Sequence, residues 1–318
     1  MSECVRLRSL AKINLDLRVL HKRGDGFHEL RTIFQTISLA DTMDVEYRPG
    51  RTKLELKSNL NIPDNLVLKA AGLVMASTRA KGQLRINLMK RIPLGGGLGG
   101  GSSNAASMLL ALPKLLGKRV PLQKLMELAA ELGSDVPFFL MGGTAVGLGR
   151  GTELYPLPDA QNWPGLLITP EIHSSTAAAY QALQRKVLGE GSTAIINNFQ
   201  SAVQSASFPT PNPQSPFVND FEMVVFHQHP QLKSMKGKLL KLGAWRAMMT
   251  GSGSALFGLF PRRELRDRAA SSFRKDFARD RVHPFTMVSR SRYRALWWRQ
   301  LAVSPEGKTW PPQDRYAG

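Results

Sequence analysis

Residues 93–104 read PLGGGLGGGSSN and hold six glycines in seven consecutive positions. The residues before them, LRINLMKRIPL at 84–94, alternate as a strand does, and the residues after them, SSNAASMLLALPKLLG at 102–117, have the spacing of a helix. Glycine allows backbone N–H groups to approach a ligand without a Cβ in the way. A helix that begins at Ser102 or Ser103 adds free N–H groups and the positive end of its dipole at the same point. The stretch is therefore predicted to hold the phosphates of a nucleotide.

Two common phosphate-binding loops do not account for this stretch. A Walker A loop needs a lysine before its Ser or Thr, whereas Gly101 is followed directly by Ser102. Gly95, Gly97 and Gly100 match the dinucleotide pattern G-x-G-x-x-G, but the acidic residue expected about 20 residues later is missing from the sequence. A flexible linker is also disfavoured, because a linker does not normally lie between a strand and a capped helix.

The glycine stretch resembles the phosphate loop of the GHMP kinases, a family of small-molecule kinases. Two further blocks are similar to the same family, AKINLDLRVLHKRGDGFHEL at 11–30 and MTGSGSALFGLF at 249–260. The motifs GSDVPFF at 133–139 and NDFE at 219–222 make the resemblance more specific. The resemblance covers residues 8–260 and points to those members that use ATP to phosphorylate an alcohol linked to cytidine diphosphate.

The resemblance implies an α+β fold of two domains, with the active site in the cleft between them. The first domain, similar to a ribosomal-protein fold, is expected over 1–158, and the second, an α+β sandwich, over 159–300. The mixed order of predicted strands and helices favours the same fold class. A proline-spaced stretch over 156–170 marks the boundary, and residues 301–318 are expected to form a flexible tail.

Two residues are candidates for the chemical step. Asp135 follows a predicted helix among apolar residues that would desolvate its carboxylate, although the pattern fits an ordinary turn aspartate equally well. Lys12 lies at the start of an apolar-alternating strand, where a lysine that faces solvent is the simpler interpretation. The resemblance assigns Asp135 as the catalytic aspartate and Lys12 as the lysine that keeps it ionised near the transferred phosphoryl group. Asn14 shares a strand face with Lys12 and is expected to reach the substrate in the same cleft.

The loop GDGFHEL at 24–30 is predicted to recognise a nucleobase. Phe27 offers a stacking face, and the neighbouring His28 offers a hydrogen bond. The resemblance assigns this pair to the cytosine of the substrate, with Phe27 at a position where the family often has tyrosine. It also implies Tyr180 as a second stacking aromatic and Thr176 as a small hydroxyl contact to the substrate.

ATP is the cofactor that the resemblance implies, with Mg²⁺ carried by its phosphates and Ser103 as a hydroxyl contact to the metal. Asn65 resembles the residue that meets the adenine, and it also fits a plain helix N-cap. No metal site built from the protein's own side chains is predicted, because the six histidines show no metal-ligand spacing. The expected nucleotide-binding residues are Asn65, Pro93, Leu94, Gly95, Gly96, Gly97, Leu98, Gly99, Gly100, Gly101, Ser102 and Ser103.

The net charge of +19, from 43 Lys and Arg against 24 acidic residues, is the unusual feature of the composition. With one cysteine, Cys4, and neither a signal peptide nor a membrane-spanning run, the chain is expected to be cytoplasmic, with no membrane partner and no obligatory nucleic acid. Two other interpretations stay open. One is a GHMP kinase for another small molecule, of the homoserine or mevalonate type. The other is a basic nucleic-acid-binding protein, suggested by the interleaved basic and aromatic residues RSRYRALWWRQ at 290–300.

Overall fold

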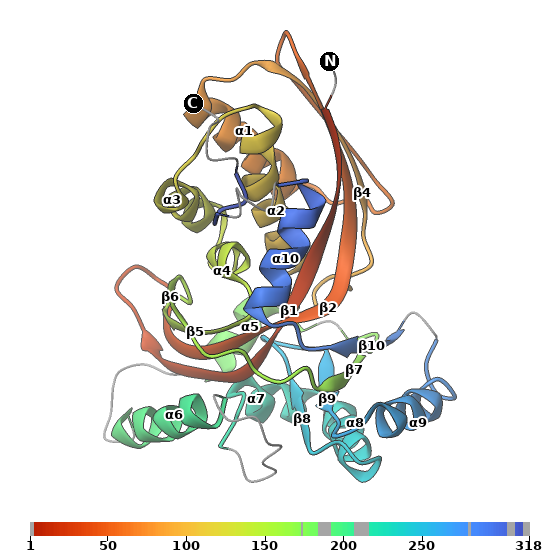
Figure 1. The fold of residues 1–318 in the computed structure, drawn as a ribbon. Coiled ribbons are helices and arrows are strands. Elements are labelled where there is room, and N and C mark those ends of the chain that lie inside the picture. The colour runs from red at the N-terminus through yellow and green to blue at the C-terminus, as the bar shows by residue number, and fades with distance from the viewer. Residues whose placement is uncertain are drawn as a thin grey trace.

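The first of two sheets is built around two long antiparallel strands, β1 (Glu3–Lys22) and β2 (His28–Pro49). The structure is a computed structural model that describes residues 3–172, 174–183, 192–206, 216–278, 281–303 and 309–313 (Figure 1). Strand β2 is central, because β1 pairs with it along one edge while β4 and β5 share the other edge. Four further strands pair with β2 or with one another, so that neighbouring strands follow the order β3-β4-β2-β5-β6. These four strands are β3 (Lys53–Ser58), β4 (Gly82–Met89), β5 (Thr144–Gly149) and β6 (Glu153–Pro156).

Five helices cover one face of this sheet (Figure 1). Strand β4 shows why that face attracts them: its residues alternate strictly, and Leu84, Ile86 and Leu88 are buried on the side of the helices. Helix α2 lies at the centre of the layer, and nearly all of its side chains are buried. The five helices are α1 (Leu66–Thr78), α2 (Gly100–Leu115), α3 (Leu122–Leu132), α4 (Val136–Met141) and α10 (Arg290–Gln300).

The second sheet has the order β10-β7-β9-β8, and all of its neighbours are antiparallel. Its strands are β7 (Pro164–Ile168), β8 (Arg246–Met249), β9 (Leu256–Leu259) and β10 (Val282–Thr286). The helices of this half are α5 (Thr176–Leu183), α6 (Ser192–Ala206), α7 (Phe221–Gln228), α8 (Pro230–Lys241) and α9 (Arg263–Phe273). A hydrophobic cluster that includes Ile13, Ile37, Phe257 and Met287 joins the two sheets. The α+β fold class is therefore confirmed.

The C-terminal part of the chain returns to the first sheet, which the sequence did not indicate. The chain leaves the first sheet after β6 and enters the second at β7, on either side of residue 158. Helix α10, expected in the second domain, instead buries Tyr293 and Trp297 in the core under the first sheet. The described residues of the expected flexible tail, 301–303 and 309–313, also pack there, because Leu301, Val303 and Trp310 supply apolar surface.

Among the described residues, no helix has both the length and the apolar character needed to cross a membrane.

The motif NDFE at 219–222 ties the first strand to the second sheet. Asn219 forms an isolated parallel bridge with Leu17, and its side chain is buried. Its amide nitrogen donates to the carbonyl oxygens of Met249 (2.8 Å) and Gly251 (2.9 Å), and its amide oxygen accepts from the N–H of Phe221 (3.0 Å). The backbone bridge of Asn219 and the three hydrogen bonds of its side chain thus fix β1, the start of α7 and the turn after β8 relative to one another.

We expect Asn219→Ala to lower the free energy of unfolding by about 2–4 kcal/mol, because it leaves two buried carbonyl groups and one N–H group without their partner. Urea denaturation followed by circular dichroism measures this change. An unchanged midpoint would show that the three hydrogen bonds are not needed to hold the two sheets together.

Candidate active site

The glycine stretch forms a loop between β4 and α2 whose backbone only glycine accommodates. Gly95, Gly97 and Gly99 have φ angles of +70°, +74° and +66°. A Cβ on Gly97 would overlap the carbonyl oxygen of Thr250, and a Cβ on Gly99 would lie 2.8 Å from the ring of Phe139. The loop is therefore pressed between the turn after β8 on one side and helix α4 on the other.

Helix α2 begins one turn earlier than the sequence indicates. Gly99 is its N-cap, in the left-handed conformation, and Gly100 is its first residue. Ser103 lies inside the helix, is 1% exposed, and donates its hydroxyl hydrogen to the Leu10 carbonyl oxygen at 2.6 Å. Ser103 therefore packs α2 against β1, and its contact to a metal stays a prediction. Ser102 is half-buried.

A groove of about 840 Å³ runs along the outer side of the loop. The exposed Leu94 and Gly95 form one wall together with Leu60, while Ile172, Arg281 and His283 of the second half form the other. This volume lies in the range of pockets that take cofactors and small ligands. Two loop residues, Gly96 and Leu98, are buried beneath it and serve the packing of the loop.

Lys12 and Asp135 lie together beside this loop. The Lys12 ammonium is 3.3 Å from Asp135 Oδ2 and lies 5.3 Å from the centre of the Phe34 ring. The Lys12 side chain is 4% exposed, whereas the Asp135 side chain is 35% exposed. Asp135 precedes α4, but its carboxylate makes no capping hydrogen bond to that helix. A buried cation thus faces a carboxylate that still reaches solvent.

The local backbone explains why Lys12 points into the cleft. β-Bulges interrupt the pairing of β1 with β2 between Leu10 and Lys12, and again between Asn14 and Asp16. A bulge changes the direction of the side chains next to it, and bulges are frequent beside active sites. The backbone N–H of Lys12 donates to the Leu98 carbonyl oxygen at 3.0 Å, so the strand is also joined directly to the glycine loop.

Asn14 is a link between segments and has little surface to offer a substrate. Its side chain is buried, and its amide oxygen accepts from the Lys12 ammonium (2.8 Å) and from the Gly251 N–H (3.1 Å). Its amide nitrogen donates to the Thr32 hydroxyl at 2.8 Å. The residue was expected to bind substrate, but these contacts make it a support for Lys12 and for the turn after β8.

Two of the three rings expected at the base, those of His28 and Tyr180, come together from opposite halves of the chain. The rings of His28 and Tyr180 stack with centroids 4.5 Å apart and an angle of 20° between their planes. Tyr180 also meets Phe221 edge-on at 4.8 Å. Burial, with the charges of Lys22 and His21, lowers the pKa of His28 below its usual 6.5. The imidazole is therefore neutral at pH 7 and can both donate and accept hydrogen bonds.

Burial raises the pKa of Tyr180 to about 12, and the Asp135 carboxylate adds to this rise. Phe27 has a different environment from its neighbour His28. It is 48% exposed, and the Arg150 guanidinium lies 4.0 Å from the centre of its ring.

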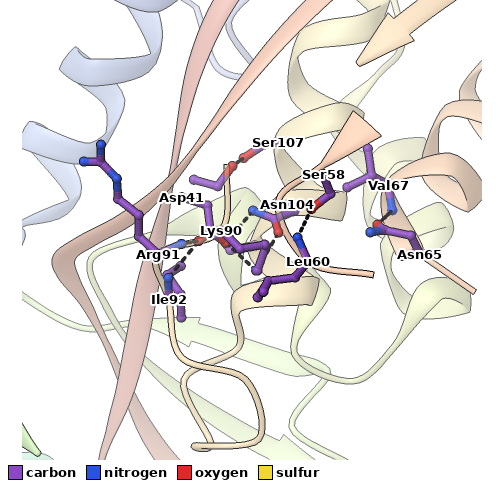
Figure 2. Close-up of polar contacts among 12 residues, drawn as sticks. Asp41, Ser58, Leu60, Asn65, Val67, Lys90, Arg91, Ile92, Asn104 and Ser107 are labelled. Carbon is purple, nitrogen blue, oxygen red and sulfur yellow. Dashed lines mark hydrogen bonds and ion pairs between the residues drawn. The ribbon is translucent and has the colours of Figure 1, made fainter. Parts of the chain in front are cut away.

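Thr176 and Asn65 occupy helix starts. Thr176 is exposed at the first position of α5, and its hydroxyl lies 2.7 Å from that of Ser252 in the turn after β8. Asn65 accepts a hydrogen bond from the Val67 N–H at 3.0 Å and so caps α1, as the sequence indicated (Figure 2).

A buried charge cluster behind the glycine loop went unnoticed in the sequence (Figure 2). The Lys90 ammonium lies 2.5 Å from Asp41 Oδ2 and donates to the Asn104 amide oxygen at 2.9 Å, while the Asn104 amide nitrogen donates back to Asp41 at 3.0 Å. The other Asp41 oxygen accepts from the N–H groups of Arg91 (2.7 Å) and Ile92 (2.8 Å). The side chains of Lys90 and Asp41 are 1% and 0% exposed, so each charge depends on the other for its stability.

This cluster fixes both ends of the glycine loop. Asp41 belongs to β2, Lys90–Ile92 lead into the loop, and Asn104 lies on the helix that follows it. Lys90 ends the alternating pattern of β4, so a lysine there looked like an ordinary strand end. Its partner Asp41 is 49 positions away, and no local pattern could have connected the two.

The described residues contain no group of three or more His, Cys, Asp or Glu side chains able to hold a metal ion.

The model of the GHMP kinase N-terminal domain matches residues 65–143, and that of the GHMP kinase C-terminal domain matches residues 212–279. The 4-diphosphocytidyl-2-C-methyl-D-erythritol kinase of Solibacter usitatus is 52% identical, over 98% of this chain and 97% of its own length.

Solved structures agree with these matches. A crystal structure of 4-(cytidine 5'-diphospho)-2C-methyl-D-erythritol kinase superposes with a TM-score of 0.72 at 36% identity, over 89% of this chain and 98% of its own. The homoserine kinase of Cytophaga hutchinsonii reaches 0.71, covering 90% of this chain and 95% of its own, but at 18% identity it shows the shared fold alone. Over nearly its whole length, therefore, the chain belongs to the GHMP kinase family, among the 4-diphosphocytidyl-2-C-methyl-D-erythritol kinases.

Proposed function

We propose that the cleft transfers the γ-phosphoryl group of ATP to the 2-hydroxyl of 4-diphosphocytidyl-2-C-methyl-D-erythritol, giving the 2-phosphate and ADP. This reaction belongs to the non-mevalonate route to isoprenoid precursors. The observation that carries the proposal is the 3.3 Å contact between the Lys12 ammonium and the partly exposed Asp135 carboxylate, next to a loop shaped for phosphates. Neither a nucleic acid nor a membrane is needed as a partner, and a cytoplasmic location stays a prediction.

Asp135 and Lys12 have different roles in the phosphoryl transfer. The substrate hydroxyl oxygen attacks the γ-phosphorus, the bond to the bridging oxygen breaks, and ADP leaves. Asp135 orients this hydroxyl and accepts its proton, which is enough because phosphoryl transfer is mainly a matter of position and charge. Lys12 pairs with Asp135 and offsets negative charge on the phosphoryl group as it moves.

Mg²⁺, when bound to the ATP phosphates, supplies further positive charge there. The ATP phosphates are proposed to carry the metal, and the described residues include no group of three or more His, Cys, Asp or Glu side chains that could bind it.

We expect Asp135→Asn to lower kcat by a factor of about 10² or more, because the amide keeps the shape of the side chain but removes its charge and basicity. The KM for the cytidine substrate should change much less, since binding in the ground state rests on other contacts. Steady-state kinetics with an ADP-coupled assay measures both.

Lys12→Met should also lower kcat, and the double variant should lose less than the product of the two single losses, because the residues act as one unit. Asp44→Asn, which removes a carboxylate paired with Arg6 on the surface, is the matched control and should keep its activity. Near-normal turnover of Asp135→Asn would make Asp135 a turn residue only.

The cytosine is proposed to bind at the ring pair of His28 and Tyr180. Aromatic stacking on a base is tolerant of small shifts, and a neutral imidazole can hydrogen-bond to the edge of the base. Phe27 adds a third ring on the same loop, and Thr176 lies one helical turn from Tyr180 on α5. The rings of His28 and Tyr180 contact each other, so a base that binds between them must separate them. Phe27 is half-exposed and has space to move when the base binds.

His28→Ala should raise the KM for the cytidine substrate about 30- to 1000-fold, the size expected for a lost hydrogen bond and a lost stacking contact. The KM for ATP should change little, because the lost contacts are local to the cytosine. His227→Ala, on α7, is the control. Equal increases in both KM values would argue against a base clamp at His28.

ATP is proposed to place its phosphates on the loop from Gly95 to Gly101 and its nucleoside toward Asn65 and the groove beside Leu94. The free N–H groups at the start of α2 and the positive end of its dipole favour anions at this point. The cluster of Asp41, Lys90 and Asn104 supports the loop from behind. Its loss should therefore weaken the binding of ATP more than the binding of the cytidine substrate.

Lys90→Met should cost about 3–5 kcal/mol of stability, because it leaves the Asp41 carboxylate buried without a cation. The KM for ATP should rise more than that for the cytidine substrate, and Asp41→Asn in the same chain should restore part of the stability. Chemical denaturation and kinetics measure the two effects. Lys53→Met, which breaks an exposed ion pair with Glu55, is the control. A loss of stability without any change in the KM for ATP would make the cluster purely structural.

A further inference from the structure

The C-terminal segment of the chain contacts the helix that carries the candidate catalytic aspartate. This segment consists of α10 and the described residues 301–303 and 309–313, and it lies beyond residue 279, where the family-model matches end. In Figure 1, α10 lies on the same side of the first sheet as α2 and α4, and the three helices share one core. Nothing in the proposed reaction so far uses these residues.

Two side chains of the segment hydrogen-bond to the last turn of α4. The Tyr293 hydroxyl donates to the Phe139 carbonyl oxygen at 2.5 Å, and the Trp310 indole N–H donates to the Leu140 carbonyl oxygen at 2.9 Å. The last carbonyl groups of a helix have no partner within the helix, so these donors complete them. The fit is close, because a Cβ on Gly142 would overlap the Tyr293 ring.

Helix α4 connects these contacts to the chemistry. It has only six residues, so its two ends move together. Asp135 precedes its first residue, and the Phe139 ring is packed against Gly99 of the phosphate loop, close to the Lys12 side chain. The two hydrogen bonds to the last turn of α4 therefore fix the position of Asp135 relative to both the phosphate loop and Lys12.

The segment is itself firmly attached, so it can act as a fixed point. The Trp298 indole N–H donates to the Thr309 carbonyl oxygen at 3.0 Å. The Gln313 side chain, 4% exposed, makes two 3.0 Å hydrogen bonds with the backbone N–H and carbonyl of Val120. The Arg294 guanidinium lies 5.1 Å from the centre of a Trp310 ring.

We propose that Tyr293 and Trp310 are positioning residues for phosphoryl transfer, which hold α4 so that Asp135 meets the substrate hydroxyl at the correct distance. The inference rests on the proposed function. A displacement of about 1 Å at a reacting group can reduce turnover strongly while leaving the binding contacts in place. The C-terminal segment is on this view part of the active-site support.

The test compares Tyr293→Phe and Trp310→Phe with Tyr47→Phe. Each of the first two removes one donor to α4 and keeps an aromatic ring in place. Tyr47 is a matched control, because its hydroxyl also donates to a backbone carbonyl, that of Lys81 at 3.0 Å, at the edge of the same core but away from α4. Thermal unfolding of all three shows whether their losses of stability are alike.

We expect kcat to fall about three- to tenfold in Tyr293→Phe and in Trp310→Phe, with the KM values for both substrates within about twofold of the wild type. Tyr47→Phe should keep its kcat. Unchanged kcat in both α4 variants, or an equal fall in Tyr47→Phe at equal loss of stability, would overturn the proposal.

Amide hydrogen exchange gives a readout that does not need the reaction. Exchange over residues 136–141 should speed up in Tyr293→Phe and Trp310→Phe and stay unchanged in Tyr47→Phe. Unchanged exchange in all three variants would refute the claim that Tyr293 and Trp310 stabilise α4. A wild-type chain that fails to phosphorylate the cytidine substrate would refute the proposed function, and the exchange data would still decide whether the segment holds α4.

Discussion

An ammonium group removed from water is the constraint on which the cleft depends. The Lys12 side chain is almost fully buried, and a buried charge is costly unless charged and polar groups surround it. Asp135 and Asn14 supply those groups, one from the turn before α4 and the other from the same strand. Asn14 also accepts from Gly251, and the Lys12 backbone donates to Leu98. The ion pair and the hydrogen bonds around Lys12 thus connect both halves of the chain with the phosphate loop.

Close contact is the second constraint, and it explains why the loop is so rich in glycine. Gly97 meets the Thr250 carbonyl and Gly99 meets the Phe139 ring at distances that leave no space for a Cβ. The buried pair of Lys90 and Asp41 holds the loop from behind through the backbone at 91–92 and through Asn104. Because side chains are absent from its surface, the loop can be fixed on several sides and still present N–H groups to a ligand.

Much of the candidate site could be predicted because its residues belong to local motifs or to blocks similar to a known family. The glycine loop and the cap at Asn65 follow from patterns within a dozen residues. Asp135 and Lys12 were ambiguous by pattern alone, and only the resemblance assigned them roles. Ser103 and Asn14 were expected to contact ligands, but both side chains are buried against other parts of the protein. The sequence does not show which face of an element another element will cover.

The sequence by itself determined the elements whose cause is local: where glycine permits left-handed turns, where a helix can begin, and which strand faces are apolar. Only the tertiary structure decided which charges meet, since Asp41 and Lys90 are 49 positions apart and Tyr293 and Phe139 are 154 apart. It also decided that the C-terminal segment leaves the second half and completes the core of the first. A tryptophan or tyrosine in the sequence indicates that a large surface will be buried, but its partner is chosen by the packing of the whole chain.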